Sequence, residues 1–113
     1  MEMIVKEENG IVSLKVAGRL DAESSILAEK QVRDIIDGGI TRIVFDFSEL
    51  DYISSAGLRV ILMTIKELRT KDGRVVLCSL NEYVQEVFDV SNFSSIIPIT
   101  ASCEEGFELL SQA

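Results

Sequence analysis

Two short apolar runs, each followed by a helical pattern, constrain the fold of this chain most strongly. RIVFDF (42–47) and RVVLCS (74–79) are dense in β-branched and aliphatic residues, as in strands that are buried on both faces of a sheet. After the first run, apolar residues recur at helical spacing and predict a helix that packs on this sheet. These residues are Leu58, Ile61, Leu62, Ile65 and Leu68. Strands that alternate with helices predict a mostly parallel sheet.

An antiparallel hairpin is predicted at the N-terminus. MIVKEE (3–8) and IVSLKVAG (11–18) alternate apolar with polar residues imperfectly, and the first looks like an edge strand. Asn9-Gly10 between them is the strongest short signal for a two-residue hairpin turn. We therefore expect the hairpin to lie at one side of the parallel sheet.

A helix is predicted over about 22–37, AESSILAEKQVRDIID. Asp21 is a good N-cap because its carboxylate can accept a hydrogen bond from an N–H of the first turn. Gly38-Gly39 is expected to end the helix. Loose helical spacing predicts its buried face, which comprises Ile26 (or Leu27), Val32 and Ile35 or Ile36.

The C-terminal third predicts two further helices and one strand. SLNE (79–82) and SCEE (102–105) match capping boxes, with Ser at the N-cap and Glu three residues later. The first of these helices is expected to run to about Val90. SIIPIT (95–100) predicts a short strand that Pro98 limits to an edge or a strand end.

The predicted order, β-β-α-β-α-β-α-β-α, describes an α/β fold. It has a mostly parallel central sheet of about five strands with an N-terminal β-hairpin, flanked by about four helices. The 113 residues, of which 47% are hydrophobic, suffice for one core, and no linker interrupts them. We therefore expect a single domain over residues 1–113, with functional residues at the carboxyl ends of its strands.

The charge of the chain argues against several classes of partner. At a net charge of −8, the protein is repelled by nucleic acids and by anionic membrane surfaces. No run approaches the roughly 18 apolar residues that a membrane span needs. The first ten residues, MEMIVKEENG, lack the basic and apolar regions of a signal peptide. We expect a cytoplasmic protein with no nucleic-acid partner and no direct membrane insertion.

Motifs for catalysis are missing from the sequence. It has no histidine, and no Gly-rich phosphate loop, zinc-protease motif or nucleophile elbow. We therefore expect no enzyme activity, no catalytic residues, no cofactor and no metal. Cys78 and Cys103 lie in different segments, and in a reducing compartment a structural disulfide between them is not expected. Asp46 ends a central strand, like the phosphoacceptor of a receiver domain, but the other acidic residues and the lysine of such a site are missing. We expect Asp46 to accept hydrogen bonds from loop N–H groups.

The stretch DYISSAGL (51–58) places two hydroxyls where a strand passes into a helix. Ser54 or Ser55 can cap the helix by accepting one of its free N–H groups. A helix N-terminus also stabilises anions, so a phosphoserine at this place would not unfold the domain. It would add about 1.5 to 2 negative charges to an exposed helix start and so hinder a docking partner. The small residues Ala56 and Gly57 leave the serine accessible.

These residues resemble a known family. IVFDFSELDYISSAGLRVIL (43–62), with GRLDA (18–22) upstream, is similar to the STAS domain of bacterial anti-sigma factor antagonists. The resemblance implies a protein that binds an anti-sigma factor, itself a serine kinase, and thereby frees a sigma factor for transcription. It also implies that the kinase inactivates the antagonist by phosphorylating a serine at the start of the second helix, and that a PP2C-type serine phosphatase reverses this.

The family pattern at this place is Asp-Ser-Ser/Thr-Gly, with the phosphate on the serine after the aspartate. In this chain Ser54 takes the place of the aspartate and Ser55 that of the phosphoacceptor, with Ser54 as the second candidate. Ala56 replaces the second hydroxyl. The resemblance implies a partner-binding set that comprises Asp21, Ser54, Ser55, Ala56, Gly57 and Arg59.

The same fold also serves a different class of function. Some STAS domains are adaptors that are not phosphorylated and act as small subunits of lipid-transport complexes, and this is the alternative. The hydroxyl of Ser55 at the acceptor place favours the phosphorylated regulator, which we expect to be monomeric when free.

Overall fold

The structure, a computed structural model, describes residues 1–112. They contain six strands and four α-helices in nearly alternating order. In chain order these are β1 (Glu2–Glu8), β2 (Ile11–Leu20), α1 (Ala22–Asp37), β3 (Arg42–Asp46), β4 (Leu50–Ile53), α2 (Ser55–Arg69), β5 (Arg74–Cys78), α3 (Glu82–Val90), β6 (Ile99–Thr100) and α4 (Cys103–Ser111). A short 3-10 helix, η1 (Phe93–Ser95), lies between α3 and β6.

The predicted N-terminal hairpin is confirmed. β1 pairs with β2 in antiparallel fashion, from Glu2 opposite Ala17 to Glu8 opposite Ile11. The turn residues Asn9 and Gly10 both have positive φ, at 53° and 78°. Two successive positive φ values give the mirror-image turn whose twist matches that of the strands, and this turn favours Asn-Gly.

The sheet has the strand order β1-β2-β3-β5-β6, with β1 at one edge. Beyond the hairpin, each pair in this order is parallel, as predicted. β4 was not predicted, and it lies outside this path because it pairs with the carboxyl end of β2. β2 thus has two parallel neighbours in succession: β3 along Ile11–Lys15 and β4 along Gly18–Leu20. The register shifts after Gly18, whose φ of 88° suits a residue without a side chain.

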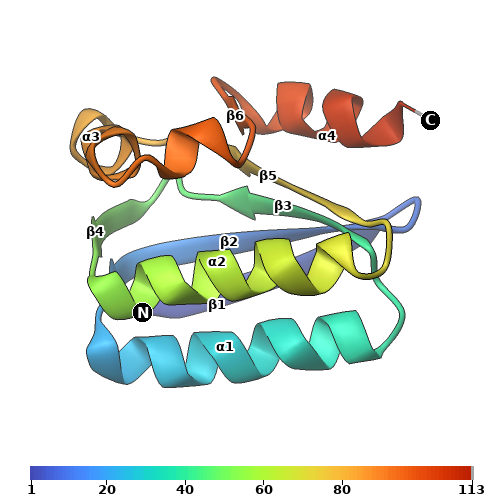
Figure 1. Ribbon diagram of the computed structural model, residues 1–113, viewed down its shortest axis with the longest axis horizontal. Coiled ribbons are helices and arrows are strands. Elements are labelled where there is room, and N and C mark those ends of the chain that lie inside the picture. The colour runs from blue at the N-terminus through green and yellow to red at the C-terminus, as the bar shows by residue number, and fades with distance from the viewer. Residues whose placement is uncertain (113) are drawn as a thin grey trace.

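Helices cover the sheet on both faces (Figure 1). α1 and α2 pack on one face, over the side of the sheet that is lower in the figure and bears the larger core cluster, and α4 packs on the other. Neighbouring residues of β3 alternate between the two cores: Ile43 and Phe45 belong to the larger one, and Val44 to the cluster under α4. This confirms that residues 42–47 contain a strand buried on both faces.

The buried face of α1 differs from the prediction. Its buried residues are Ser25, Ala28, Val32 and Ile36. Ile26 and Leu27 are 75% and 53% exposed. Val32 and Ile36 were predicted correctly, but the choice of Ile26 or Leu27 was wrong. The small residues Ser25 and Ala28 continue the helical spacing of the buried face and permit a close approach, which a search for large apolar residues overlooks.

The buried face of α2 is also rotated from the predicted stripe. Ile61, Ile65 and Leu68 are buried as predicted. The other two members of the stripe, Leu58 and Leu62, are only partly buried. Val60 lies off the stripe and is buried. α2 is therefore covered on two sides, by the sheet and by α1.

Besides the serine pair before α2, three helix starts were predicted, and two of these three are correct. Asp21 caps α1, and Ser102 caps α4 by accepting the Glu105 N–H at 3.2 Å. α3 is capped by Asn81, whose Oδ1 accepts the Val84 N–H at 2.8 Å. The prediction that Ser79 caps this helix was therefore wrong. That serine has a φ of 61°, in a left-handed turn between β5 and α3 that local spacing does not reveal. The last strand is only two residues long and begins directly after Pro98, which agrees with the expectation that this proline limits it. The predicted segment before Pro98 is not strand, and its first residue belongs to η1.

The expectation about the cysteines was wrong. Cys78 and Cys103 form a disulfide, with their Cα atoms 5.2 Å apart, inside the range that a disulfide requires. The prediction depended on the expected compartment. It could not foresee that the parallel sheet brings the end of β5 beside the start of α4, 25 residues later.

Among residues 1–112, no helix combines the length with the apolar character that crossing a lipid bilayer would require.

The aromatic cluster beneath α3 provides a test of the core. Phe88 is 0% exposed, and its ring centroid lies 6.2 Å from that of Phe47 and 6.0 Å from that of Phe93. Phe88→Ala should lower the free energy of unfolding by about 3–5 kcal/mol, because it leaves a cavity between these rings. The 80% exposed Val90 on the same helix provides the control, since Val90→Ala should change it by less than about 0.5 kcal/mol. Urea denaturation measures both, and equal effects would contradict this account of the core.

Candidate functional site

The unpredicted strand β4 delivers the two serines to the start of α2. β4 is anchored by Asn81, whose side-chain amide donates to the Leu50 carbonyl at 2.9 Å. At its other end, the Ser54 N–H donates to the Leu20 carbonyl at 2.9 Å. The serines therefore follow a strand that is fixed at both ends.

Ser54 is the N-cap of α2, which confirms that one of the two serines caps this helix. Its Oγ accepts the Gly57 N–H at 3.2 Å and donates to the Leu20 carbonyl at 3.0 Å. The side chain is half-buried. The Ser54 hydroxyl is therefore engaged as both donor and acceptor inside the fold.

Ser55 is in a different environment, although it is the next residue. It is the first residue of α2, it is exposed, and its hydroxyl has no hydrogen-bond partner within residues 1–112. Arg59 lies one turn further along α2 and is also exposed, whereas Ala56 is half-buried. The first turn of α2 contains no acidic residue. Ser55 thus presents a free hydroxyl at a helix N-terminus whose first turn contains no negative charge.

Gly57 faces the interior of the domain. It is buried, and a Cβ added to it would lie 2.7 Å from Ile53 Cγ1 and 3.0 Å from the Leu20 carbonyl oxygen. Glycine is required because the start of α2 passes this close to the ends of β2 and β4. Gly57 therefore acts as a packing residue that positions the exposed serine.

Asp21 caps α1 through a capping box with Ser24. Its Oδ1 accepts the Ser24 N–H at 3.0 Å, and the Asp21 N–H donates to Ser24 Oγ at 3.0 Å. The hydrogen bond from the Ser24 backbone, followed by that from its hydroxyl and by the charge of Arg19, lowers the pKa of Asp21. The carboxylate therefore remains charged at neutral pH.

The N-termini of α1 and α2 meet at Leu20. Leu20 directly precedes Asp21, the N-cap of α1. Its carbonyl oxygen accepts hydrogen bonds from Ser54, the N-cap of α2. An open groove runs between the first turns of the two helices, and its lining includes Ile26 and Arg59. The grouping of Asp21, Ser55 and Arg59 in one partner-binding set stays a prediction. Of the three, only Arg59 lines the groove, and no hydrogen bond or ion pair joins them within residues 1–112.

The exposed apolar residues of α1 at this place were missed by the sequence analysis. Ile26 (or Leu27) was assigned to the core, whereas the structure exposes both. Ile26 lines the groove, and Leu27 lines a separate open pocket beside Asp21. The signal that could have identified them is the competing stripe of Ser25, Ala28 and Val32, which continues at helical spacing without them.

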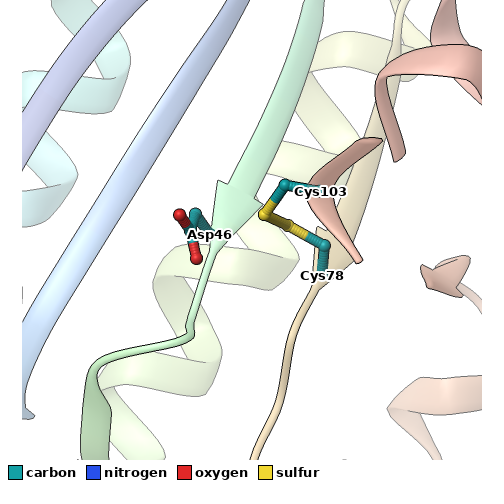
Figure 2. Close-up of side chains that lie close together, drawn as sticks. All are labelled: Asp46, Cys78 and Cys103. Atoms are coloured by element: carbon teal, nitrogen blue, oxygen red, sulfur yellow. A yellow bond between two sulfur atoms is a disulfide. The ribbon is translucent and has the colours of Figure 1, made fainter. Parts of the chain in front are cut away.

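A second cluster of chemically active groups lies at the carboxyl ends of β3 and β5 (Figure 2). The donor atoms of Asp46, Cys78 and Cys103 all lie within 4.8 Å of one another, as in a metal site. The two sulfurs are bonded to each other, however, and are not thiolate ligands in this form. Asp46 Oδ1 accepts the Ser48 N–H at 2.9 Å, which is the loop hydrogen bond expected for it.

Comparison with known proteins gives a consistent picture. The family model described as STAS domain matches residues 2–106. BtrV of Bordetella bronchiseptica, which is assigned by name to the anti-sigma factor antagonists, is 38% identical over 104 residues. The match spans 92% of this chain and 90% of that protein.

Solved structures show the same fold. A Thermotoga maritima protein, also assigned to the anti-sigma factor antagonists, superposes with a TM-score of 0.93 at 27% identity and covers 97% of this chain and 95% of its own. SpoIIAA of Bacillus has been solved in unphosphorylated and phosphorylated forms, with TM-scores of 0.77 and 0.76. The unphosphorylated form is 21% identical, and the match covers 99% of this chain and 100% of that one. The phosphorylated form is 22% identical, and the match covers 95% of this chain and 97% of that one. At these identities the two structures show the fold alone.

The different roles of the two serines can be tested through stability. Ser54→Ala should lower the free energy of unfolding by about 1–2 kcal/mol, because it removes the cap and leaves a half-buried carbonyl without one donor. Ser55→Ala should change it by less than about 0.5 kcal/mol, since the hydroxyl is exposed. Urea denaturation of both variants measures the difference, and a larger loss for Ser55→Ala would reverse the assignment.

The cap at Asp21 predicts a specific pH dependence. Its pKa is lower in the folded than in the unfolded protein, so its ionisation stabilises the fold above the unfolded pKa. This contribution is lost as the pH falls through the folded pKa. Asp21→Asn retains a capping oxygen but cannot ionise. The difference in urea midpoint between wild type and Asp21→Asn should therefore shrink between about pH 6 and about pH 2. A difference that stays constant with pH would show that the charge has no such role.

Proposed function

The chain belongs to the STAS domain family, and from this premise we propose that it is an anti-sigma factor antagonist controlled by phosphorylation of Ser55. In this proposal it is a binding protein and not an enzyme. Its unphosphorylated form binds an anti-sigma factor that is also a serine kinase, and this releases the sigma factor. A PP2C-type serine phosphatase restores the active form.

The observation that carries this proposal is the contrast between the two serines. Phosphorylation of Ser54 would remove the helix cap and break the hydrogen bond to the Leu20 carbonyl. Phosphorylation of Ser55 would break no hydrogen bond within residues 1–112. A kinase can therefore modify Ser55 in the folded protein, whereas the Ser54 hydroxyl would first have to break its two hydrogen bonds.

The surroundings of Ser55 accommodate a phosphate. Uncapped N–H groups of the first turn of α2 stabilise an anion, and Arg59 lies four residues along the same helix. The modified domain should therefore keep its fold. What changes is the surface, where a dianion replaces a neutral hydroxyl beside the groove between α1 and α2.

We place the partner surface around this groove. It would combine the Asp21 side of α1 with Ser55, Ala56 and Arg59 of α2, and the exposed Ile26 would provide apolar contact area. Ser54 and Gly57 would fix the position of this surface through the helix cap and the close packing beneath it. A phosphate here would have to be desolvated on docking, and complexes tolerate an unpaired charge poorly.

The proposal extends to the setting of the protein. An acidic chain that acts on a regulator of transcription is expected in the cytoplasm of a bacterium, as a monomer when free. SpoIIAA, which has the same fold, exists in phosphorylated and unphosphorylated forms. This supports a phosphorylation switch in the present chain.

Charge at position 55 should be sufficient to weaken the complex. Ser55→Asp should weaken binding of the kinase that co-purifies with wild type by on the order of tenfold or more, because it adds a desolvated charge. Ser55→Ala should bind normally but accept no phosphate from that kinase and ATP. Ser94→Asp, at an exposed serine in η1, adds the same charge elsewhere and should leave binding unchanged. Calorimetry measures the affinities, and normal binding of Ser55→Asp would contradict the electrostatic account.

The modification itself is tested in the organism. Intact-mass and peptide mass spectrometry of the protein from growing and stressed cells should show a phosphate on Ser55 with an occupancy that changes between conditions. If Ser54 and Ser55 are unmodified throughout and a membrane ATPase co-purifies in place of a kinase, the protein is a STAS adaptor of a transport complex and the proposal is wrong.

A further inference from the structure

The disulfide joins two cysteines with unequal access to solvent. Cys78, at the end of β5, is 0% exposed, and its carbonyl accepts the Phe47 N–H at 3.1 Å inside the sheet. Cys103 is the first residue of α4 and is only half-buried. It lines an open groove between α4 and the N-terminal hairpin, together with Ile11 and Phe107. A small molecule in this groove can reach Cys103, whereas Cys78 lies behind it.

From this asymmetry we propose that the pair is a reversible thiol–disulfide couple that reacts with small thiols and disulfides. Cys103 is the sulfur that exchanges with the small molecule, and Cys78 is the resolving thiol. This inference is independent of Ser55 and of the partner-binding surface.

The exchange balances without a further reactant. In reduction, a thiolate attacks Cys103 Sγ, forms a mixed disulfide and displaces Cys78 as a thiolate that takes a proton from water. A second thiolate attacks the small-molecule sulfur of this mixed disulfide and releases Cys103. The protein disulfide gains two electrons, and two small thiols become one small disulfide. Oxidation runs in reverse: Cys103 attacks the small disulfide, and Cys78 then attacks Cys103 Sγ.

Some of the groups around the sulfurs favour a thiolate on Cys103, and others oppose it. The N-terminus of α4 favours a thiolate on Cys103, as at other helix starts. The carboxylate of Asp46 within 4.8 Å and the acidic residues Glu104 and Glu105 of the first turn oppose it. Ser79 Oγ lies 3.7 Å from Cys103 Sγ, within hydrogen-bond distance of sulfur. The assignment of Cys103 therefore rests on access and not on charge.

The fold around the pair can tolerate reduction. α4 is also held by Leu110, which is buried in the cluster beneath it, and by the Arg74 guanidinium, which donates to the Leu109 carbonyl at 3.3 Å. Breaking the disulfide removes a covalent link but leaves these contacts. The reduced protein should therefore remain folded, with its two thiols close enough to close again.

The test uses single-cysteine variants and oxidised glutathione as the probe. Folded, reduced Cys78→Ser should retain one glutathionyl group on Cys103, because no resolving thiol is present. Cys103→Ser should react on the order of tenfold or more slowly, because only the buried sulfur remains. Wild type should lose two hydrogens and retain no glutathione. Intact-mass spectrometry over time distinguishes these products.

A second measurement does not depend on the variants. Reduced wild type is treated with a limiting amount of iodoacetamide, and peptide mass spectrometry compares the two cysteines. Cys103 should be alkylated first in the native protein, and the two rates should become similar in urea. Equal rates in the native protein would overturn the proposal. So would adduct formation on Cys103→Ser as fast as on Cys78→Ser, or a wild-type disulfide that glutathione reduces only after unfolding.

Discussion

The candidate site depends on one carbonyl group. The Leu20 oxygen, at the end of β2, accepts both the N–H and the hydroxyl of Ser54, and these two bonds fix the start of α2 beside the start of α1. Gly57 makes the approach possible, since any side chain there would collide with Leu20 and Ile53. The two helix N-termini therefore lie at the same end of the sheet. The exposed position of Ser55 follows from this junction.

The junction also explains how adjacent serines can have separate tasks. A cap must be engaged with the backbone, and a modification site must be free of it. Ser54 meets the first requirement through Gly57 and Leu20, and Ser55 meets the second. A phosphate on Ser55 would change the charge of the surface without a structural change beneath it. The opposite face of the sheet carries the disulfide between Cys78 and Cys103 under α4, so the two chemistries occupy different parts of the molecule.

Much of the site could be predicted from sequence, because its parts are local. A serine pair before an amphipathic pattern predicts a helix cap, and the resemblance of residues 43–62 to a family assigns a role to the neighbouring serine. The sequence did not decide which serine caps the helix, since both are compatible with local spacing. It also assigned Ile26 (or Leu27) to the core, because the small residues on the buried face of α1 carry little hydrophobic signal.

The sequence by itself determined the order of the elements apart from β4, because hydrophobic periodicity is a local property. It also determined the Asn9-Gly10 turn and the caps at Asp21 and Ser102, because these depend on residues a few positions apart. Only the tertiary structure decided the features that depend on distant partners. β4 exists as a strand because it pairs with the end of β2, and Ser54 is the cap because Leu20 binds it. Cys78 reaches Cys103 because parallel packing places the end of β5 beside α4. Pairings of this kind leave no trace in local spacing, since they are set by how the sheet assembles.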